Sequence, residues 1–129
     1  TTDSLVEGSH FRREWSPPRL LGRKALSVNL SDIAAMAGLP RYATVSLCLR
    51  AETTLAFVDG LYDGLLERAA ETGVSLVGGN LAATGGPLVI DVALVGAESI
   101  DVMLWFVCDD DVPEDAAGRA ESARPMTSS

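Results

Sequence analysis

The chain has 129 residues, of which 47% are hydrophobic and 22% are charged, and its formal net charge is -8. This length and hydrophobic content suit one globular domain with a sizeable core. The acidic balance argues against a nucleic-acid partner, although phosphates can still be bound where divalent cations lie between the two negative groups. No run approaches the roughly 20 apolar residues of a membrane span, and no leader pattern opens the chain. We therefore expect a cytoplasmic protein with no membrane partner.

The cysteines indicate free thiols. Cys48 and Cys108 form no CxxC spacing, and the chain has a single histidine, so neither a disulfide framework nor a zinc site is predicted. The chain opens without Met on "TTDSLVEG", which has the pattern of the inside of a strand. We interpret this opening as that of a fragment.

The first predicted elements are a strand and a helix. Residues 1–6 alternate loosely and are followed by a polar and aromatic loop, "SHFRREW". Ser16 is the expected N-cap of a helix over about 18–37, because prolines are tolerated in its first turn. Gly38 and Pro40 are expected to stop this helix.

An aspartate interrupts the apolar sequence of this helix. Asp32, beside Ser31, lies near the border of the predicted buried face. An aspartate at such a position is more often a locally hydrogen-bonded or surface residue than a ligand. The predicted stripe consists of Leu21, Ala25, Val28, Ser31 with Asp32, and Ala35.

The next two elements are a strand and a second helix. Residues 42–50, "YATVSLCLR", are rich in β-branched and apolar residues, which indicates a strand. An apolar stripe then predicts a helix with Thr53 or Thr54 as its N-cap and Gly73 as its C-cap.

Two further strands are predicted after this helix. Residues 74–79 form a short strand, residues 78–87 a glycine-containing loop, and residues 88–96 another strand. With only about 30 residues between successive strands, the economical architecture is α+β, a mixed β-sheet with helices packed on one face. The predicted domain covers 1–96. Residues 97–129 are expected to be a divergent or disordered tail, whose sequence could come from divergence or from a shifted reading frame.

Polar residues occur at three places where packing alone would not put them. These are "TTD" at 1–3, "NLSD" at 29–32 and "GGN" at 78–80, and we expect the three to meet at one edge of the sheet. Converging carboxylates and hydroxyls are the oxygen ligands that Mg²⁺ requires. A phosphoryl-transfer site can be built in this way without a P-loop.

Three segments carry a family resemblance. "TTDSLVEGSHF", "GRKALSVNLSDIAAMAGLPRYATVSL" and "LVGGN" resemble the N-terminal, ATP-binding half of thiamine-monophosphate kinases, in the PurM-like (aminoimidazole ribonucleotide synthetase) superfamily. The resemblance covers residues 1 to about 96, and "NLSDIAAM" is its most specific motif. It implies a PurM N-terminal-domain-like fold and Mg²⁺-dependent transfer of the γ-phosphoryl of ATP to thiamine monophosphate, which gives thiamine diphosphate. It also implies a homodimer that pairs through this domain.

The resemblance assigns roles to particular residues but identifies no catalytic one. His10 would contact the substrate, and Tyr62, Gly79 and Asn80 would lie at the nucleotide. Without the resemblance, His10 is as often a surface residue as a ligand, and core packing explains Tyr62 equally well. The implied metal ligands are Thr1, Thr2, Asp3, Asp32 and Asn80.

The sequence also departs from the family pattern. Asn80 stands where the family usually has an aspartate after Gly78 and Gly79, so weaker metal binding is expected there. A strand that should precede Thr1, and a second domain, are not found in the chain. Two alternatives remain open. One is another PurM-like ATP-dependent enzyme, such as a selenophosphate synthetase or a hydrogenase-maturation protein, although "GSHF" and "NLSDIAAM" favour the thiamine enzyme. The other is a non-catalytic dimerisation domain.

Overall fold

The computed structural model describes residues 1–98. The predicted tail over 97–129 therefore lies outside the described residues, apart from 97 and 98, which end the last strand. The same holds for Cys108, whereas Cys48 is a free thiol as expected. The elements in chain order are β1 (Thr2–Val6), α1 (Pro18–Ala35), β2 (Gly38–Leu49), α2 (Leu55–Thr72), β3 (Ser75–Ala83) and β4 (Val89–Glu98).

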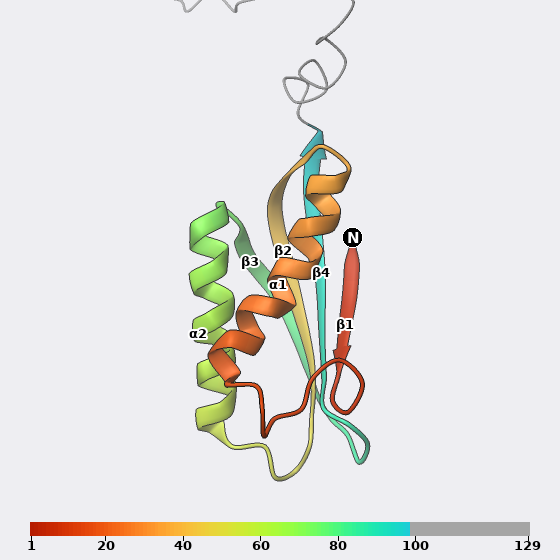
Figure 1. Cartoon of the computed structure of the whole chain (residues 1–129), viewed down its shortest axis with the longest axis vertical. Helices are drawn as coiled ribbons and strands as arrows, with labels where there is room; N and C mark the ends of the chain where they lie inside the picture. The colour runs from red at the N-terminus through yellow and green to blue at the C-terminus, as the bar shows by residue number, and fades with distance from the viewer. Residues whose placement is uncertain (99–129) are drawn as a thin grey trace, which may run out of the picture. The chain divides into compact units, whose positions relative to one another are not determined.

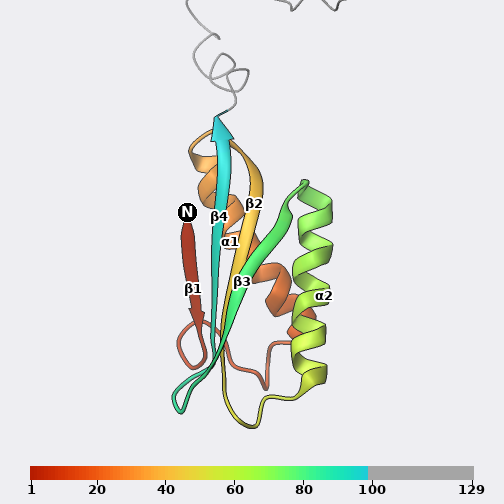
Figure 2. The same cartoon turned by 180° about the vertical axis from the view of Figure 1, so that it is seen from behind.

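The four strands form one mixed sheet in the order β1-β4-β2-β3. β4 pairs antiparallel with both β1 and β2, whereas β2 and β3 are parallel. Both helices cover the same face of the sheet (Figure 1), and the view from behind shows the other face uncovered (Figure 2). The predicted α+β architecture, a mixed sheet with helices on one face, is confirmed. Neither helix within residues 1–98 has the length and hydrophobicity to cross a membrane.

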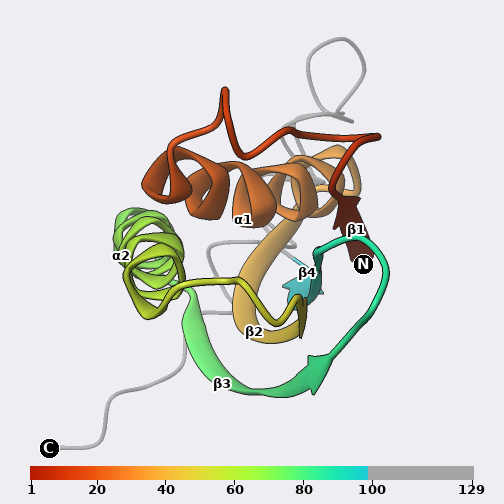
Figure 3. The same ribbon diagram turned by 90° about the horizontal axis from the view of Figure 1, so that it is seen from below.

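Strand alternation places the core between the sheet and the helices. Along β2 and β4, every second side chain points toward the helix layer and is buried, while the residues between them face the open side. The view along the strands shows the sheet curving around the two helices (Figure 3). The residues that β2 and β4 bury are Ala43, Val45, Leu47, Ile90, Val92 and Leu94.

Two glycines let α1 and α2 pack at backbone distance. A Cβ on Gly22 would strike the carbonyl oxygen of Leu61, and a Cβ on Gly64 would strike the carbonyl of Arg19. Each helix therefore has a glycine where the backbone of the other comes closest. Any side chain at either position would force the helices apart.

Ion pairs bridge the same two helices on their exposed side. Arg23 donates to both carboxylate oxygens of Glu71, at 2.8 and 3.0 Å, and Arg68 also donates to Glu71 at 3.0 Å. These hydrogen bonds, from Arg23 first and Arg68 second, lower the pKa of Glu71 to about 2. The cluster is therefore fully charged at neutral pH. Because it is solvent-exposed, it contributes less to stability than the buried contacts beneath it.

The ends of α1 differ from the sequence prediction. The N-cap is Pro17 rather than Ser16, and no side-chain hydrogen bond caps the helix. At the other end, Ala37 has a left-handed φ of 54°, which ends the helix two residues earlier than expected. Gly38 and Pro40, predicted as a helix stop, belong instead to β2, where Gly38 pairs with Glu98 of β4.

The ends of α2 are as predicted, but β3 is longer. Thr54 accepts a hydrogen bond from the Phe57 amide at 3.2 Å, and Gly73 caps the other end with a φ of 69°. The expected loop over 78–87 is wrong at its start, because residues 78–83 continue β3 in parallel pairing with β2.

Candidate functional site

The N-terminal end of the described chain meets α1 through polar side chains. The Thr1 hydroxyl donates to Asp32 at 3.1 Å and lies 3.4 Å from the amide oxygen of Asn29. Asn29 is fully buried, and its amide nitrogen donates to the Ala25 carbonyl at 3.3 Å. Asp32, one turn further along α1, is exposed. The structure thus joins two of the predicted sites, "TTD" and "NLSD", and we call this group the Thr1–Asp32 site.

The other two residues of "TTD" point to opposite faces of the sheet. Asp3 alternates with buried Leu5, so it lies on the helix side, the same side as Thr1. Thr2 lies on the open side, where its hydroxyl is 3.5 Å from the carboxylate of Asp91. Asp3 is therefore placed near the Thr1–Asp32 site, whereas the Thr2 side chain is directed away from it.

A separate hollow lies where Tyr62 of α2 faces β3. It has a volume of about 250 Å³ and is lined by Tyr62 and by residues 78–81. Gly79 has a packing reason to be glycine, because a Cβ there would strike the carbonyl oxygen of Val45 on β2. The predicted nucleotide residues Tyr62, Gly79 and Asn80 therefore share one hollow, in which the bare backbone of Gly79 is accessible. We call it the glycine hollow.

The sheet order separates these two places. β1 and β3 are the outer strands on opposite edges, so the expectation that all three motifs meet at one edge is wrong. Asp3 pairs with Val92, Val92 with Val45, and Val45 with Gly79. Three strand spacings, about 14 Å, thus separate Asp3 from Gly79. Within one copy of the chain, Asn80 does not join the cluster of Asp32.

The oxygen atoms of the Thr1–Asp32 site could supply part of the coordination shell of Mg²⁺. Within residues 1–98 no three His, Cys, Asp or Glu side chains gather closely enough to hold a metal ion. Mg²⁺, however, is commonly bound through one or two carboxylates, with waters and substrate phosphates completing its shell. Asp32 and Asp3, supported by the Thr1 hydroxyl, fit that kind of partial site. They do not form a complete metal cage.

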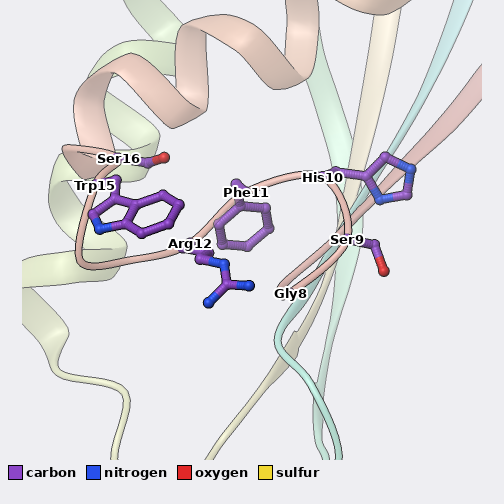
Figure 4. Close-up of a pocket in the computed structure, with 7 residues that line it drawn as sticks. All are labelled: Gly8, Ser9, His10, Phe11, Arg12, Trp15 and Ser16. Carbon is purple, nitrogen blue, oxygen red and sulfur yellow. The ribbon is translucent and has the colours of Figure 1, made fainter.

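His10 lies in the loop between β1 and α1. Its Nδ1 accepts a hydrogen bond from the Val6 amide at 3.0 Å, so the proton of the neutral ring is on Nε2. Its carbonyl accepts from Lys24 Nζ at 2.8 Å. A hollow of about 310 Å³ is lined by this loop, and the imidazole points away from the indole of Trp15 (Figure 4). The structure thus places His10 on the loop surface rather than in the core.

Two polar residues at these sites were given no role of their own from the sequence, although Asn29 is the first residue of "NLSD". Asn29 occupies the buried stripe of α1, and its position four residues after Ala25 and four before Ile33 is the signal that would have identified it. Asp91 accepts from Ser4 at 2.6 Å on the open face. In register, Asp91 lies between Ser4 and Ser46, and Ser46 pairs with Asn80, so a polar row crosses the open face.

The fold and these sites define a class of protein, a mixed-sheet domain with a polar carboxylate site at one edge of the sheet and a glycine-lined hollow at the other. Residues 1–98 match the family model described as AIR synthase related protein, N-terminal domain. The chain belongs to this family.

Within this family, the chain is similar to proteins named thiamine-monophosphate kinase. The chain is 39% identical over 94 residues to the thiamine-monophosphate kinase of Bacillus subtilis, and 40% identical over 96 residues to that of Aquifex aeolicus. These matches cover 73% and 74% of this chain but 29% and 31% of the relatives. The chain therefore spans about a third of the length of the curated relatives it matches.

Solved structures of thiamine monophosphate kinases are also similar to this chain. The crystal structure of thiamine monophosphate kinase from Aquifex aeolicus matches with a TM-score of 0.72 and 39% identity, over 75% of this chain and 32% of that one. A structure described as AaThiL complexed with AMPPCP and TMP matches with a TM-score of 0.71 and 40% identity, over 74% and 30% of the two chains. The hydrogenase maturation protein HypE in complex with ATP, at 21% identity and a TM-score of 0.66 over 78% of this chain and 30% of that one, shares the fold.

Proposed function

We propose that the chain is the N-terminal, nucleotide-binding domain of a thiamine-monophosphate kinase, an enzyme that transfers the γ-phosphoryl of ATP to thiamine monophosphate. The observation that carries this proposal is the 39–40% identity across the whole described domain to kinases of that name, one of them solved with AMPPCP and TMP. The alternative PurM-like enzymes are supported less, because the match to HypE is only 21% identical.

Two regions of the structure support nucleotide binding. The glycine hollow has accessible backbone at Gly79, beside the ring of Tyr62, which suits the close approach of a nucleotide. The Thr1–Asp32 site has the carboxylate and hydroxyl oxygens that Mg²⁺ prefers, and bound Mg²⁺ would supply positive charge to neutralise the phosphates during transfer. Asp3 and Asp32 would hold the ion, and the Thr1 hydroxyl would orient the Asp32 carboxylate. His10, on its exposed loop, would contact the acceptor.

The activity is tested with the protein expressed from its complete coding sequence. Supplied with ATP, Mg²⁺ and thiamine monophosphate, it is expected to form thiamine diphosphate and ADP in equal amounts. Parallel reactions with selenide in place of thiamine monophosphate distinguish the PurM-like alternative. Turnover of selenide without formation of thiamine diphosphate would refute the proposed function.

We further propose that the domain forms a homodimer through the open face of the sheet, in the cytoplasm. Tyr42 and Val95 are register partners on that face, and they are 54% and 62% exposed. Uncovered apolar side chains on a sheet face favour association. Sedimentation at micromolar concentration is expected to show a dimer, and Val95→Lys to shift it toward monomer. Leu66→Lys, at an exposed leucine of α2, is the control that should leave the dimer intact. A wild-type monomer would contradict this proposal.

A further inference from the structure

The loop between β1 and α1 is long for a segment without regular structure, and two different sets of contacts hold its two halves. Its first half, residues 8–11, folds back on the end of β1. The amides of Ser9 and His10 donate to the Val6 carbonyl at 3.1 and 2.9 Å, and Phe11 is buried. Lys24 of α1 holds the His10 carbonyl. This half is therefore attached to β1, α1 and the core.

The second half, residues 12–16, lies further out. Trp15 is 76% exposed, its amide donates to the Arg12 carbonyl at 3.1 Å, and the Arg12 guanidinium lies 5.0 Å from the centre of the indole ring. These contacts are internal to the segment and do not attach it to the sheet. Among the described residues, the side chain that attaches this segment to the rest of the domain is that of Arg13. Its Nε donates a hydrogen bond to Glu7 at 2.5 Å.

Glu7 is built into the domain more firmly than an ordinary surface carboxylate. Its side chain is only 13% exposed. Its second oxygen lies 3.4 Å from the amide of Leu88, which immediately precedes β4, and 3.9 Å from Arg50, which immediately follows β2. Arg13 also reaches Glu52 at 3.6 Å, but the side chain of Glu52 is 55% exposed. A charge-assisted hydrogen bond to a largely buried carboxylate is stronger than an exposed ion pair. Glu7 is thus the principal anchor of Arg13.

We propose that Glu7 is a positioning residue which, through Arg13, holds residues 12–16 in place and so keeps Arg12 and Trp15 fixed at the hollow that also contains His10. This inference rests on the proposed function, in which His10 contacts the acceptor. A loop of this length loses conformational entropy when a ligand orders it. Holding it before binding removes that loss and favours acceptor binding.

The test follows the two halves of the loop separately in the 129-residue chain. Trp105, the second of the two tryptophans, is replaced by phenylalanine in every sample, so that fluorescence anisotropy reports on Trp15 alone. Amide exchange, measured by NMR, follows the hydrogen-bonded amides of His10 and Trp15. In Glu7→Gln we expect the Trp15 amide to exchange about tenfold faster, which corresponds to about 1.4 kcal/mol, and the anisotropy to fall. The His10 amide should be unaffected.

Three further variants test whether the effect is specific to the pair of Glu7 and Arg13. Arg13→Gln should reproduce Glu7→Gln, and the double variant should be no worse than either single variant, because the two residues act as one pair. Lys24→Met should do the reverse, speeding exchange at His10 but not at Trp15. Glu14→Gln removes a charge from the same loop. Glu14 forms no ion pair with any residue in 1–98, so this variant should change nothing.

Two results would overturn the proposal. One is an unchanged Trp15 anisotropy in Glu7→Gln and Arg13→Gln. The other is faster exchange at Trp15, His10 and the core amides of β4 alike, which would show a general loss of stability. A second experiment distinguishes the role of Glu7 from the proposed function. In it, thiamine monophosphate is titrated into the protein expressed from the complete coding sequence. A wild type that does not bind it would refute the proposed function while leaving the loop result intact. A rigid-loop wild type that binds about tenfold more tightly than Glu7→Gln would support both.

Discussion

Replacing Gly64 with alanine is expected to lower the free energy of unfolding by about 1–2 kcal/mol, a large part of the 5–15 kcal/mol typical of a domain. The added methyl group would enter the space occupied by the Arg19 carbonyl of α1. Since that atom belongs to helix backbone, relief requires α1 and α2 to separate, and overpacking of this kind costs about 1–3 kcal/mol or more. The gain of up to about 1 kcal/mol in helix propensity offsets only part of this. Urea unfolding measures the change.

Gly60→Ala is the matched control, since it lies in the same helix and gains the same propensity. A Cβ at Gly60 would meet the ring of Pro18 at 3.0 Å, which a shift of a few tenths of an ångström relieves, whereas a Cβ at Gly64 would overlap the Arg19 carbonyl oxygen. We expect a smaller loss than at Gly64. Equal stability of Gly64→Ala and wild type would show that the helices are not packed at backbone distance.

Changing Asp32 to asparagine is expected to weaken binding of Mg²⁺ with nucleotide at least about tenfold, because one of the two carboxylates of the proposed site is removed. Stability without metal should change little, since Asp32 is exposed and a neutral amide can still accept the Thr1 hydroxyl hydrogen bond. Isothermal titration of Mg²⁺ in the presence of the non-hydrolysable analogue AMPPCP measures the affinity.

Two further variants act as controls for this change. Asp91→Asn removes a carboxylate from the same sheet, but on the open face, and should leave the affinity unchanged. Asn80→Asp adds a carboxylate at the glycine hollow, on the sheet edge opposite β1, and in combination with Asp32→Asn it should not restore the lost affinity. Equal weakening by Asp91→Asn and Asp32→Asn would point to net charge rather than to a site.

Local signals predicted the elements that are held by local contacts. Thr54 and Gly73 bound α2 as expected, since a cap acts within one turn of the chain. The start of β2 and the length of β3 were not predictable in the same way. Gly38, and Gly78 with Gly79, are typical of turns, but here pairing with β4 and with β2 decides their conformation. Those partners lie tens of residues away, and a local pattern does not contain them.

The candidate site was also predictable only in part. The segments "TTD" and "NLSD" were correctly expected to meet, and the hydrogen bond from Thr1 to Asp32 joins them. The position of "GGN" was not predictable, because it depends on the order of strands in the sheet, which puts β3 on the edge opposite β1. Asp32 was expected near the border of the buried face, but it is exposed, and the buried polar residue of that helix is Asn29. The predicted stripe continued through Val28 and Ser31, whereas the residues that α1 buries in this part are Asn29 and Ile33.

Thermal unfolding with and without Mg²⁺ and AMPPCP tests most directly whether this domain binds a nucleotide through Mg²⁺. A ligand that binds only the folded state adds about 2.7 kcal/mol at one hundred times its dissociation constant, about 10–20 °C for a domain of this size. Wild type is expected to gain most of this shift only when both are present. Asp32→Asn is expected to lose at least about half of the gain, as a tenfold weaker affinity requires, while melting like wild type without them. A melting temperature that does not respond to Mg²⁺ and AMPPCP in wild type, or one that falls equally in Asp32→Asn with and without them, would contradict the account.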